Sequence, residues 1–213
     1  MCFSAVASFS ASAILLVAGV AALKKVNAPS QILFASIPLL FSIQQFTEGF
    51  VWLSLTNGDY TLWRDFATKL FLVFAQVVWP VLVPFSMVLM ERDEGRKKIL
   101  LALTVMGSVL AAYLAVCLFI FPVQATIHSG HIHYQLNFPI ALTWISGVFY
   151  FLPTVLPSFV SGVKRMPLLG IVILVSYLVT KFYFAEDIIS VWCYFAAVAS
   201  VVVLLILTRM DAL

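Results

Sequence analysis

The chain has 213 residues, of which 63% are hydrophobic and only 10% are charged. Soluble globular domains carry charge on about a quarter of their residues, so this composition excludes a water-soluble fold. The net charge of +3 comes from basic residues gathered in short connections between apolar runs, and we predict no nucleic-acid partner.

Apolar residues form continuous runs of about 20 residues, long enough to cross a hydrocarbon core roughly 30 Å thick. In chain order the runs cover residues 5–23, 32–55, 66–90, 99–121, 139–160, 167–185 and 188–208. Seven such runs leave too little polar chain to cover them in water. We therefore predict an all-α fold, a single domain of seven transmembrane helices over residues 1–213, integral to a bacterial inner membrane or a plasma membrane.

Basic residues lie in every second connection, and this alternation predicts the orientation of the chain in the membrane. The residues concerned are Lys24, Lys25, Arg92, Arg96, Lys97, Lys98, Lys164, Arg165 and Arg209. Because cytoplasmic connections are the basic ones, we predict that the N-terminus lies outside and the C-terminus in the cytoplasm.

The second run, 32–55, contains a polar cluster below its outer end. Glu48 lies about seven residues from that end, with Gln44 and Gln45 one turn before it and Trp52 one turn after it on the same helix face. A charge at membrane depth costs ~2.5–3.5 kcal/mol on insertion scales. Glu48 is therefore the residue that burial in lipid explains least, and we take the four side chains as candidate site residues.

Lys69 is expected at a similar depth on the following run, and Gln76, a further candidate binding residue, lies two turns deeper on the same face. Three readings are open. Lys69 and Glu48 form a structural ion pair between neighbouring helices, or Glu48 is a site carboxylate in an outward-facing cavity with Lys69 as its charge partner. A third reading leaves Glu48 protonated or at the lipid edge.

More polar residues gather at the outer end of the sixth run. Lys181 lies four residues from that end, where it either extends outward to the interface or binds a ligand. Glu186 and Asp187 form the outer turn into the last run. We include all three among the candidate binding residues.

The three cysteines, Cys2, Cys117 and Cys193, are also expected toward the outer side. An oxidising compartment there would permit one disulfide, which would leave the third thiol free. A cysteine inside a helix also packs as a small hydrophobic residue. Both readings stay open.

All the histidines of the chain, His128, His131 and His133, lie in one connection between Pro122 and Pro139. An extended backbone would point His131 and His133 the same way, and the Ser129-Gly130 dipeptide permits a turn that brings His128 to them. Three imidazoles suit zinc, and cysteines at the same level would widen the choice to copper. A pH-responsive or ligand-binding loop and a purely structural loop are the alternatives.

The segments MCFSAVASFSASAILLVAGVAAL and ASIPLLFSIQQFTEGFVWL resemble a family of small, multi-spanning, largely bacterial membrane proteins of unknown function that open with Met-Cys-Phe-Ser-Ala. The resemblance covers the first two runs. Its most distinctive residues here are Cys2, Ser4, Gln44, Gln45, Glu48 and Trp52. It implies a membrane protein and no particular activity.

These features lead to three functional hypotheses. The first is an outward-facing polar site in which Glu48 and Lys69 act on a lipid-like substrate with a metal-activated water. The second is a transporter or receptor that binds a small molecule without chemistry. The third is an accessory subunit of a larger membrane complex, whose polar residues are assembly contacts.

Overall fold

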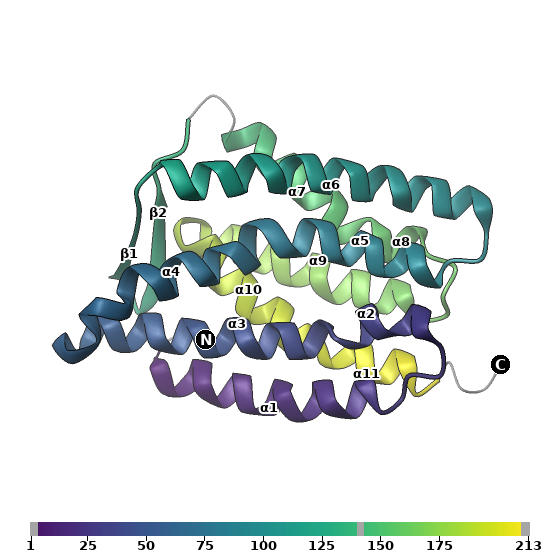
Figure 1. The fold of residues 1–213 in the computed structure, drawn as a ribbon, viewed down its shortest axis with the longest axis horizontal. Coiled ribbons are helices and arrows are strands. Elements are labelled where there is room, and N and C mark those ends of the chain that lie inside the picture. The colour runs from purple at the N-terminus through teal and green to yellow at the C-terminus, as the bar shows by residue number, and fades with distance from the viewer. Residues whose placement is uncertain (1–3, 140–142, 210–213) are drawn as a thin grey trace.

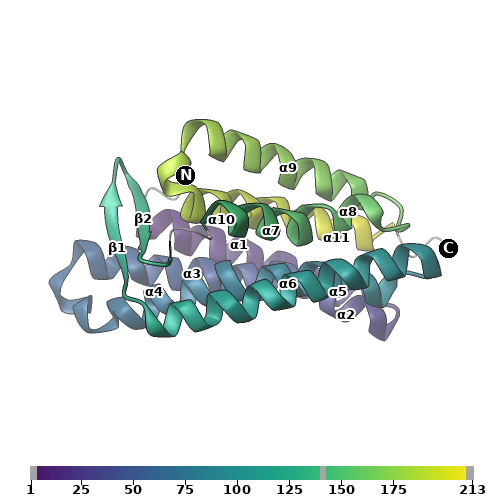
Figure 2. The ribbon, with the colours of Figure 1, turned by 90° about the horizontal axis from the view of Figure 1, so that it is seen from above.

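Helices that run lengthwise beside one another make up most of the computed structural model, which describes residues 4–139 and 143–209, with the backbone alone for residues 143–146. Figures 1 and 2 show this elongated bundle with a β-hairpin across one end. In chain order the elements are α1 (Ala5–Leu23), the 3₁₀ turn η1 (Pro29–Gln31), α2 (Ile32–Ala35), α3 (Ile37–Thr56), the 3₁₀ helix η2 (Gly58–Trp63), α4 (Arg64–Val73), the π-helical turn η3 (Phe74–Val78), α5 (Trp79–Met90), α6 (Glu94–Ile120), β1 (Val123–His128), β2 (His131–Leu136), α7 (Thr143–Val155), α8 (Pro157–Val160), α9 (Met166–Tyr183), the 3₁₀ turn η5 (Ala185–Asp187), α10 (Ile188–Ala199) and α11 (Val201–Leu207).

Helices occupy each of the seven predicted runs, and five helical segments of the described chain are long and apolar enough to cross a membrane. They are Ala5–Leu23, Gly58–Met90, Glu94–Ile120, Met166–Tyr183 and Ala185–Leu207. The second run is interrupted between α2 and α3 and carries the polar cluster around Glu48, and the fifth contributes a shorter apolar helix, Gly147–Val160. The predicted helical character is confirmed to this extent, and these five segments are compatible with a membrane protein.

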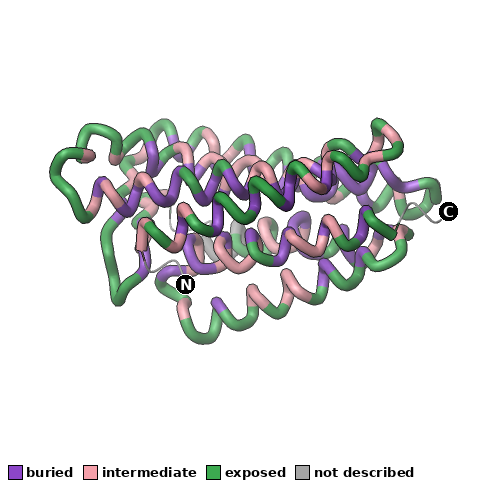
Figure 3. The backbone as a smooth tube through the Cα atoms, turned by 90° about the horizontal axis from the view of Figure 1, so that it is seen from below, coloured by how far each residue is buried: buried purple, intermediate pink, exposed green. Residues whose placement is uncertain are grey.

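Large apolar side chains remain exposed along the outside of the bundle. Val17, Val109 and Phe119 are each more than two-thirds exposed. Figure 3 shows exposed and buried segments alternating along the helices, so each helix buries one face in the bundle and exposes the other on the outside. An apolar outer surface of this kind suits contact with lipid rather than with water.

Close contacts between small residues hold the first helices together. The Ser12 hydroxyl donates to the Ser42 carbonyl oxygen at 2.9 Å, and the Ser42 hydroxyl donates to the Ser12 carbonyl oxygen at 2.8 Å. Gly49 lies so close to Phe9 that an added Cβ would stand 2.6 Å from the ring. Small residues and reciprocal hydrogen bonds are the usual means of joining helices within lipid.

A π-helical turn interrupts the third predicted run. The Trp79 amide donates to the Phe74 carbonyl five residues earlier, and the next residue is Pro80, which has no N–H to offer the Gln76 carbonyl. Gly107 of α6 packs against this segment so closely that a Cβ there would lie 1.9 Å from the Pro80 carbonyl oxygen. The π-helical turn therefore changes the rotation of the helix about its axis at a point where the chain contacts α6.

The prediction of an entirely helical fold is wrong between residues 123 and 136, which form an antiparallel hairpin. Ser129 and Gly130 form its two-residue turn with φ of 47° and 80°, the positive values that a tight hairpin requires. The predicted extended conformation of His131–His133 is correct. The strand that pairs with it was not predicted, although β1 also alternates apolar and polar residues from Val123 to His128.

Candidate functional site

A polar cluster is enclosed where α3, α5 and α10 meet. Gln44, Gln45 and Glu48 of α3 are all fully buried. The Ser190 hydroxyl of α10 donates to Glu48 Oε1 at 2.6 Å, and the Trp79 indole N–H of α5 donates to Gln44 Oε1 at 2.7 Å. The predicted face of the second run is thus confirmed as one inward-facing group.

Several atoms of this cluster make no hydrogen bond of ordinary geometry to the residues that the structure describes, although Gln45 lies beside Glu48 and Gln44 lies beside the Cys193 thiol. They are Glu48 Oε2, Gln44 Nε2, both side-chain polar atoms of Gln45, and Trp52 Nε1. A buried polar group left unpaired costs about 1–3 kcal/mol. Such groups in native proteins call for a specific explanation, such as a strained site, a functional role, or water or an ion beside them.

Lys69 does not belong to this cluster, and its predicted pairing with Glu48 is wrong. The buried face of α4 carries Ala67, Thr68 and Phe71, which turns Lys69 to the exposed side of the helix. No ion pair joins Lys69 to Glu48 in the described chain. Similar depth on neighbouring helices does not by itself bring two side chains into contact, because they must also face each other.

The hairpin rests on the turn between α9 and α10 through two of its histidines. The His133 Nδ1 atom lies 2.8 Å from the Glu186 carbonyl oxygen and 3.3 Å from Asp187 Oδ1. The His128 ring lies 3.5 Å from Asp187 Oδ2 and 3.6 Å from Glu186 Oε2. Because a carbonyl oxygen only accepts, His133 donates from Nδ1. The predicted residues Glu186 and Asp187 thus meet the histidine segment.

His131 has a different environment, although it shares a strand face with His133. Its residue is 4% exposed, and its ring packs edge-to-face on Phe184 with centroids 4.9 Å apart. Burial lowers the pKa of His131, against the opposing charge of Asp187. His128 and His133 instead engage carboxylates, and the described residues contain no group of three or more histidine, cysteine or acidic side chains arranged to hold a metal.

A cavity of about 360 Å³ lies beyond the enclosed cluster, between η3, the end of β2, α7, α9 and α10. Gln76 and Lys181, both predicted as binding residues, line it. Leu136 and Phe138, at and after the end of β2, form part of its wall. The hairpin therefore contributes to the enclosure of this space.

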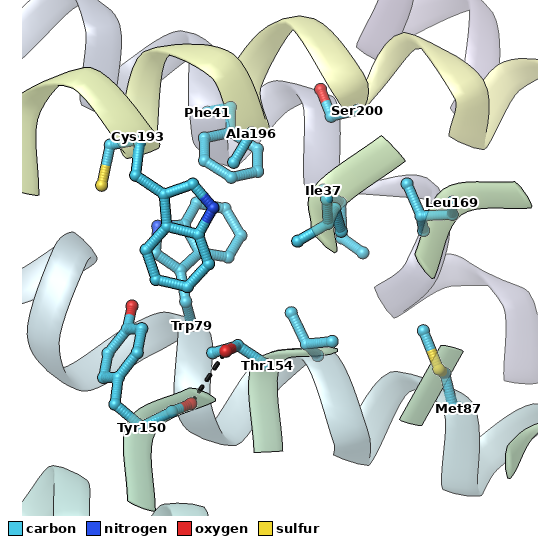
Figure 4. A pocket seen from close by; sticks show the side chains of 13 residues that line it. Ile37, Phe41, Trp79, Met87, Tyr150, Thr154, Leu169, Cys193, Ala196 and Ser200 are labelled. Atoms are coloured by element: carbon cyan, nitrogen blue, oxygen red, sulfur yellow. Dashed lines mark hydrogen bonds between the residues drawn. The ribbon is translucent and has the colours of Figure 1, made fainter. Parts of the chain in front are cut away.

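A second, smaller cavity of about 50 Å³ lies farther along the bundle, and Figure 4 shows its lining. Tyr150, Trp192 and Cys193 line both cavities. From Cys193 and Tyr150 at one end, the smaller cavity extends toward Met87 and Leu169 at the other (Figure 4). The two spaces therefore adjoin along the length of the bundle.

Contacts at this boundary connect the cavities with the polar cluster. The Cys193 thiol lies beside Gln44. The Tyr150 hydroxyl donates to the Ala75 carbonyl of η3, so the π-helical turn fixes one side of the boundary. Cys193 and Cys117 are buried free thiols, and Cys2 lies outside the described residues. The reading of these two cysteines as small buried side chains agrees with the structure.

A family model of a family of unknown function matches residues 1–212. The chain belongs to the DUF6629 family. The resemblance seen in the first two runs thus extends to membership over nearly the whole chain. No curated protein and no solved structure matches this DUF6629 chain.

The predicted site residues of this DUF6629 protein separate into three places. The first is the enclosed cluster around Glu48, the second is the cavity with Gln76 and Lys181, and the third is the hairpin contact with Glu186 and Asp187. Tyr150 and Trp192 were not predicted as site residues. Aromatic residues occur throughout the apolar runs, and no sequence signal distinguishes these two.

Proposed function

We propose that this DUF6629 protein is a seven-span integral membrane protein that binds a small molecule inside its helix bundle, as a receptor or transporter. The observation that carries the proposal is the cavity of about 360 Å³ next to an enclosed polar cluster with unpaired atoms. Its volume falls within the range of about 300–1,000 Å³ typical of small-molecule sites. The adjoining inner cavity extends the space along the bundle, as transport or reception would require.

The arrangement of the connections supports the proposed orientation, with the hairpin end outside. The α1–η1, α5–α6 and α8–α9 connections lie together at the end of the bundle opposite the hairpin (Figure 1). They contain Lys24, Lys25, Arg92, Lys164 and Arg165, and Arg96 lies in the first turn of α6 beside them. A basic end of this kind is expected on the cytoplasmic side.

The metal-dependent enzyme that the histidines suggested has less support than binding without chemistry. Catalytic zinc needs three converging protein ligands and an open position. His131 packs on Phe184, whereas His128 and His133 approach Asp187 and Glu186. We therefore assign these two histidines to hairpin attachment. Glu48 is assigned to the enclosed polar cluster next to the ligand space, outside the lining of either cavity. An accessory-subunit role remains the alternative that the following experiment tests.

Gly147 of α7 offers a direct test because it lines the larger cavity and an added Cβ would meet no atom within 4 Å. Gly147→Trp should fill the cavity. Gly58→Trp is the matched control, because Gly58 also has open space around it but lies in η2, outside the cavity lining. Both proteins would be purified in mild detergent, extracted with solvent and analysed by mass spectrometry.

We expect a near-stoichiometric small molecule from the wild type and from Gly58→Trp, and its loss from Gly147→Trp at unchanged monodispersity. The same species in all three proteins would contradict binding in this cavity. Its absence from all three, together with co-purification of a defined membrane complex, would favour the accessory-subunit role.

A further inference from the structure

We propose that the ligand of the two adjoining cavities is a single-chain anionic amphiphile, with its acidic head at Lys181 and its chain directed toward the smaller cavity. This inference rests on the proposed binding function and specifies the chemical class of the ligand.

The charge of the larger cavity indicates an anionic head. Among the described residues that line it, Lys181 is the one with a charge, and it forms no ion pair with another described residue. Neither Asp nor Glu is among the described side chains that line the cavity. Glu186 and Asp187, the acidic residues nearest to Lys181 in sequence, approach the hairpin histidines. An acidic head could therefore approach the ammonium group without facing a carboxylate in the cavity wall.

The neutral polar groups of the lining also favour an acceptor-rich head. The Trp192 indole N–H is buried and has no hydrogen-bond partner in the described chain, and an indole only donates. Gln76 and Tyr177 add an amide and a hydroxyl to the same lining. Carboxylate and phosphate oxygens are strong acceptors for such donors.

The smaller cavity has the chemistry expected around a hydrocarbon chain. Ile37, Val83, Met87 and Leu169 are among its lining residues, and none of the described residues that line it is charged. Because Tyr150, Trp192 and Cys193 line both spaces, a chain that leaves the larger cavity at this boundary enters apolar surroundings. A hydrocarbon chain that comes from the bilayer therefore keeps apolar surroundings when it enters this cavity.

The size of the cavities restricts the number of chains. The larger space, at about 360 Å³, is near the lower limit for small-molecule sites, and the inner one is only about 50 Å³. A single chain suits these dimensions, whereas a two-chain phospholipid does not. Fatty acids and alkyl phosphates share the required chemistry.

The test uses the full chain in phosphatidylcholine nanodiscs and four radiolabelled probes with the same chain length. The probes are palmitate, hexadecyl phosphate, hexadecanol and hexadecyltrimethylammonium, and nanodiscs without protein correct for partitioning into lipid. We expect the wild type to bind at least one of the two anions about tenfold or more tightly than the alcohol, a difference of about 1.4 kcal/mol. The relative affinities of palmitate and hexadecyl phosphate would identify the preferred head.

Charge variants of Lys181 make the test specific. Lys181→Met should reduce the affinity for the anion to that for hexadecanol, and Lys181→Glu should shift the preference to the cation. Lys69→Met is the matched control, because Lys69 is also exposed but does not line the cavity. It should leave all four affinities unchanged.

Equal affinities for the anions and the alcohol in the wild type, or an anion preference that survives Lys181→Met, would overturn the inference. Failure of the proposed function gives a different result. If a co-purified molecule disappears in Gly147→Trp while neither anion binds, the binding site stands and the anionic assignment is wrong. If no co-purified molecule and no probe depends on the cavity, the proposed function itself is wrong.

Discussion

Glu48 and Glu91 are both buried carboxylates, but they have opposite hydrogen-bonding environments. Glu91, at the basic end of the bundle, accepts hydrogen bonds from the Gly162 amide at 2.6 Å and from the Arg92 and Asp93 amides at 3.1 Å. Glu48 accepts from Ser190 through one oxygen, and its other oxygen has no partner in the described chain. Glu91 is therefore used to join two connections, whereas Glu48 retains an unused acceptor.

The first prediction removes the carboxylate that joins the connections. Glu91→Ala leaves the Gly162, Arg92 and Asp93 amides without their acceptor. We expect a loss of about 2–3 kcal/mol in the free energy of unfolding, because hydrogen bonds to a charged group are the stronger ones. Denaturant unfolding in a fixed detergent would measure it. Unfolding no easier than that of the wild type would show that these amides find other partners.

The same carboxylate predicts an acid dependence of stability. Desolvation opposes its ionisation, yet the hydrogen bonds from Gly162, Asp93 and Arg92 and the charge of Arg96 lower the pKa of Glu91 below its ordinary value of 4.5. A lowered folded-state pKa contributes stability that is present above pH 4.5 and is lost as the pH falls through the folded value.

We therefore expect Tm to fall in this acidic range more steeply for the wild type than for Glu91→Gln. Scans from pH 6 to pH 3 would compare the two proteins. Parallel curves would exclude Glu91 as the group responsible.

The third prediction concerns the other carboxylate of the comparison. Glu48→Gln keeps the side-chain shape and retains an oxygen that can accept from Ser190, so we expect the free energy of unfolding to change by about 1 kcal/mol or less. The amount of co-purified small molecule should fall severalfold, because the polar group beside the ligand space has changed. Ser190→Ala is the control for loss of the internal hydrogen bond alone. Unchanged ligand content in Glu48→Gln would remove Glu48 from the site.

The smallest effect is expected from the histidines. Protein purified without chelators and supplied with zinc or copper should hold no more metal than a variant with His128, His131 and His133 all replaced by Ala, because the His131 ring packs on Phe184 while His128 and His133 approach Glu186 and Asp187. Elemental analysis would compare them. Near-stoichiometric metal that disappears in the variant would restore the metal-dependent enzyme hypothesis.

The sequence predicted the features that depend on local pattern. Apolar runs located the helices, and the i, i+4 spacing of Gln44, Glu48 and Trp52 correctly placed them on one buried face. The Ser129-Gly130 dipeptide correctly indicated a turn. These properties are set by residues close together in the chain.

Features that depend on distant residues were not predictable in the same way. Ser190 reaches Glu48 from 142 positions away, and the larger cavity takes its lining from η3, α7, α9 and α10. The side of α4 on which Lys69 lies depends on how that helix is rotated about its own axis. Depth in the membrane does not reveal this rotation. Helix packing therefore decides which of the predicted polar residues meet.

The π-helical turn at Phe74–Val78 has a consequence for insertions and deletions in the gene. Each residue of an α-helix turns the chain by about 100°, so removing one codon here would rotate α4 relative to α5 while leaving both helices apolar. Such a deletion would preserve the hydropathy profile but would swing Gln76 and the Ala75 carbonyl away from Tyr150. Among family members, a length change at this one place would therefore mark a differently lined cavity, even where every apolar helix is retained.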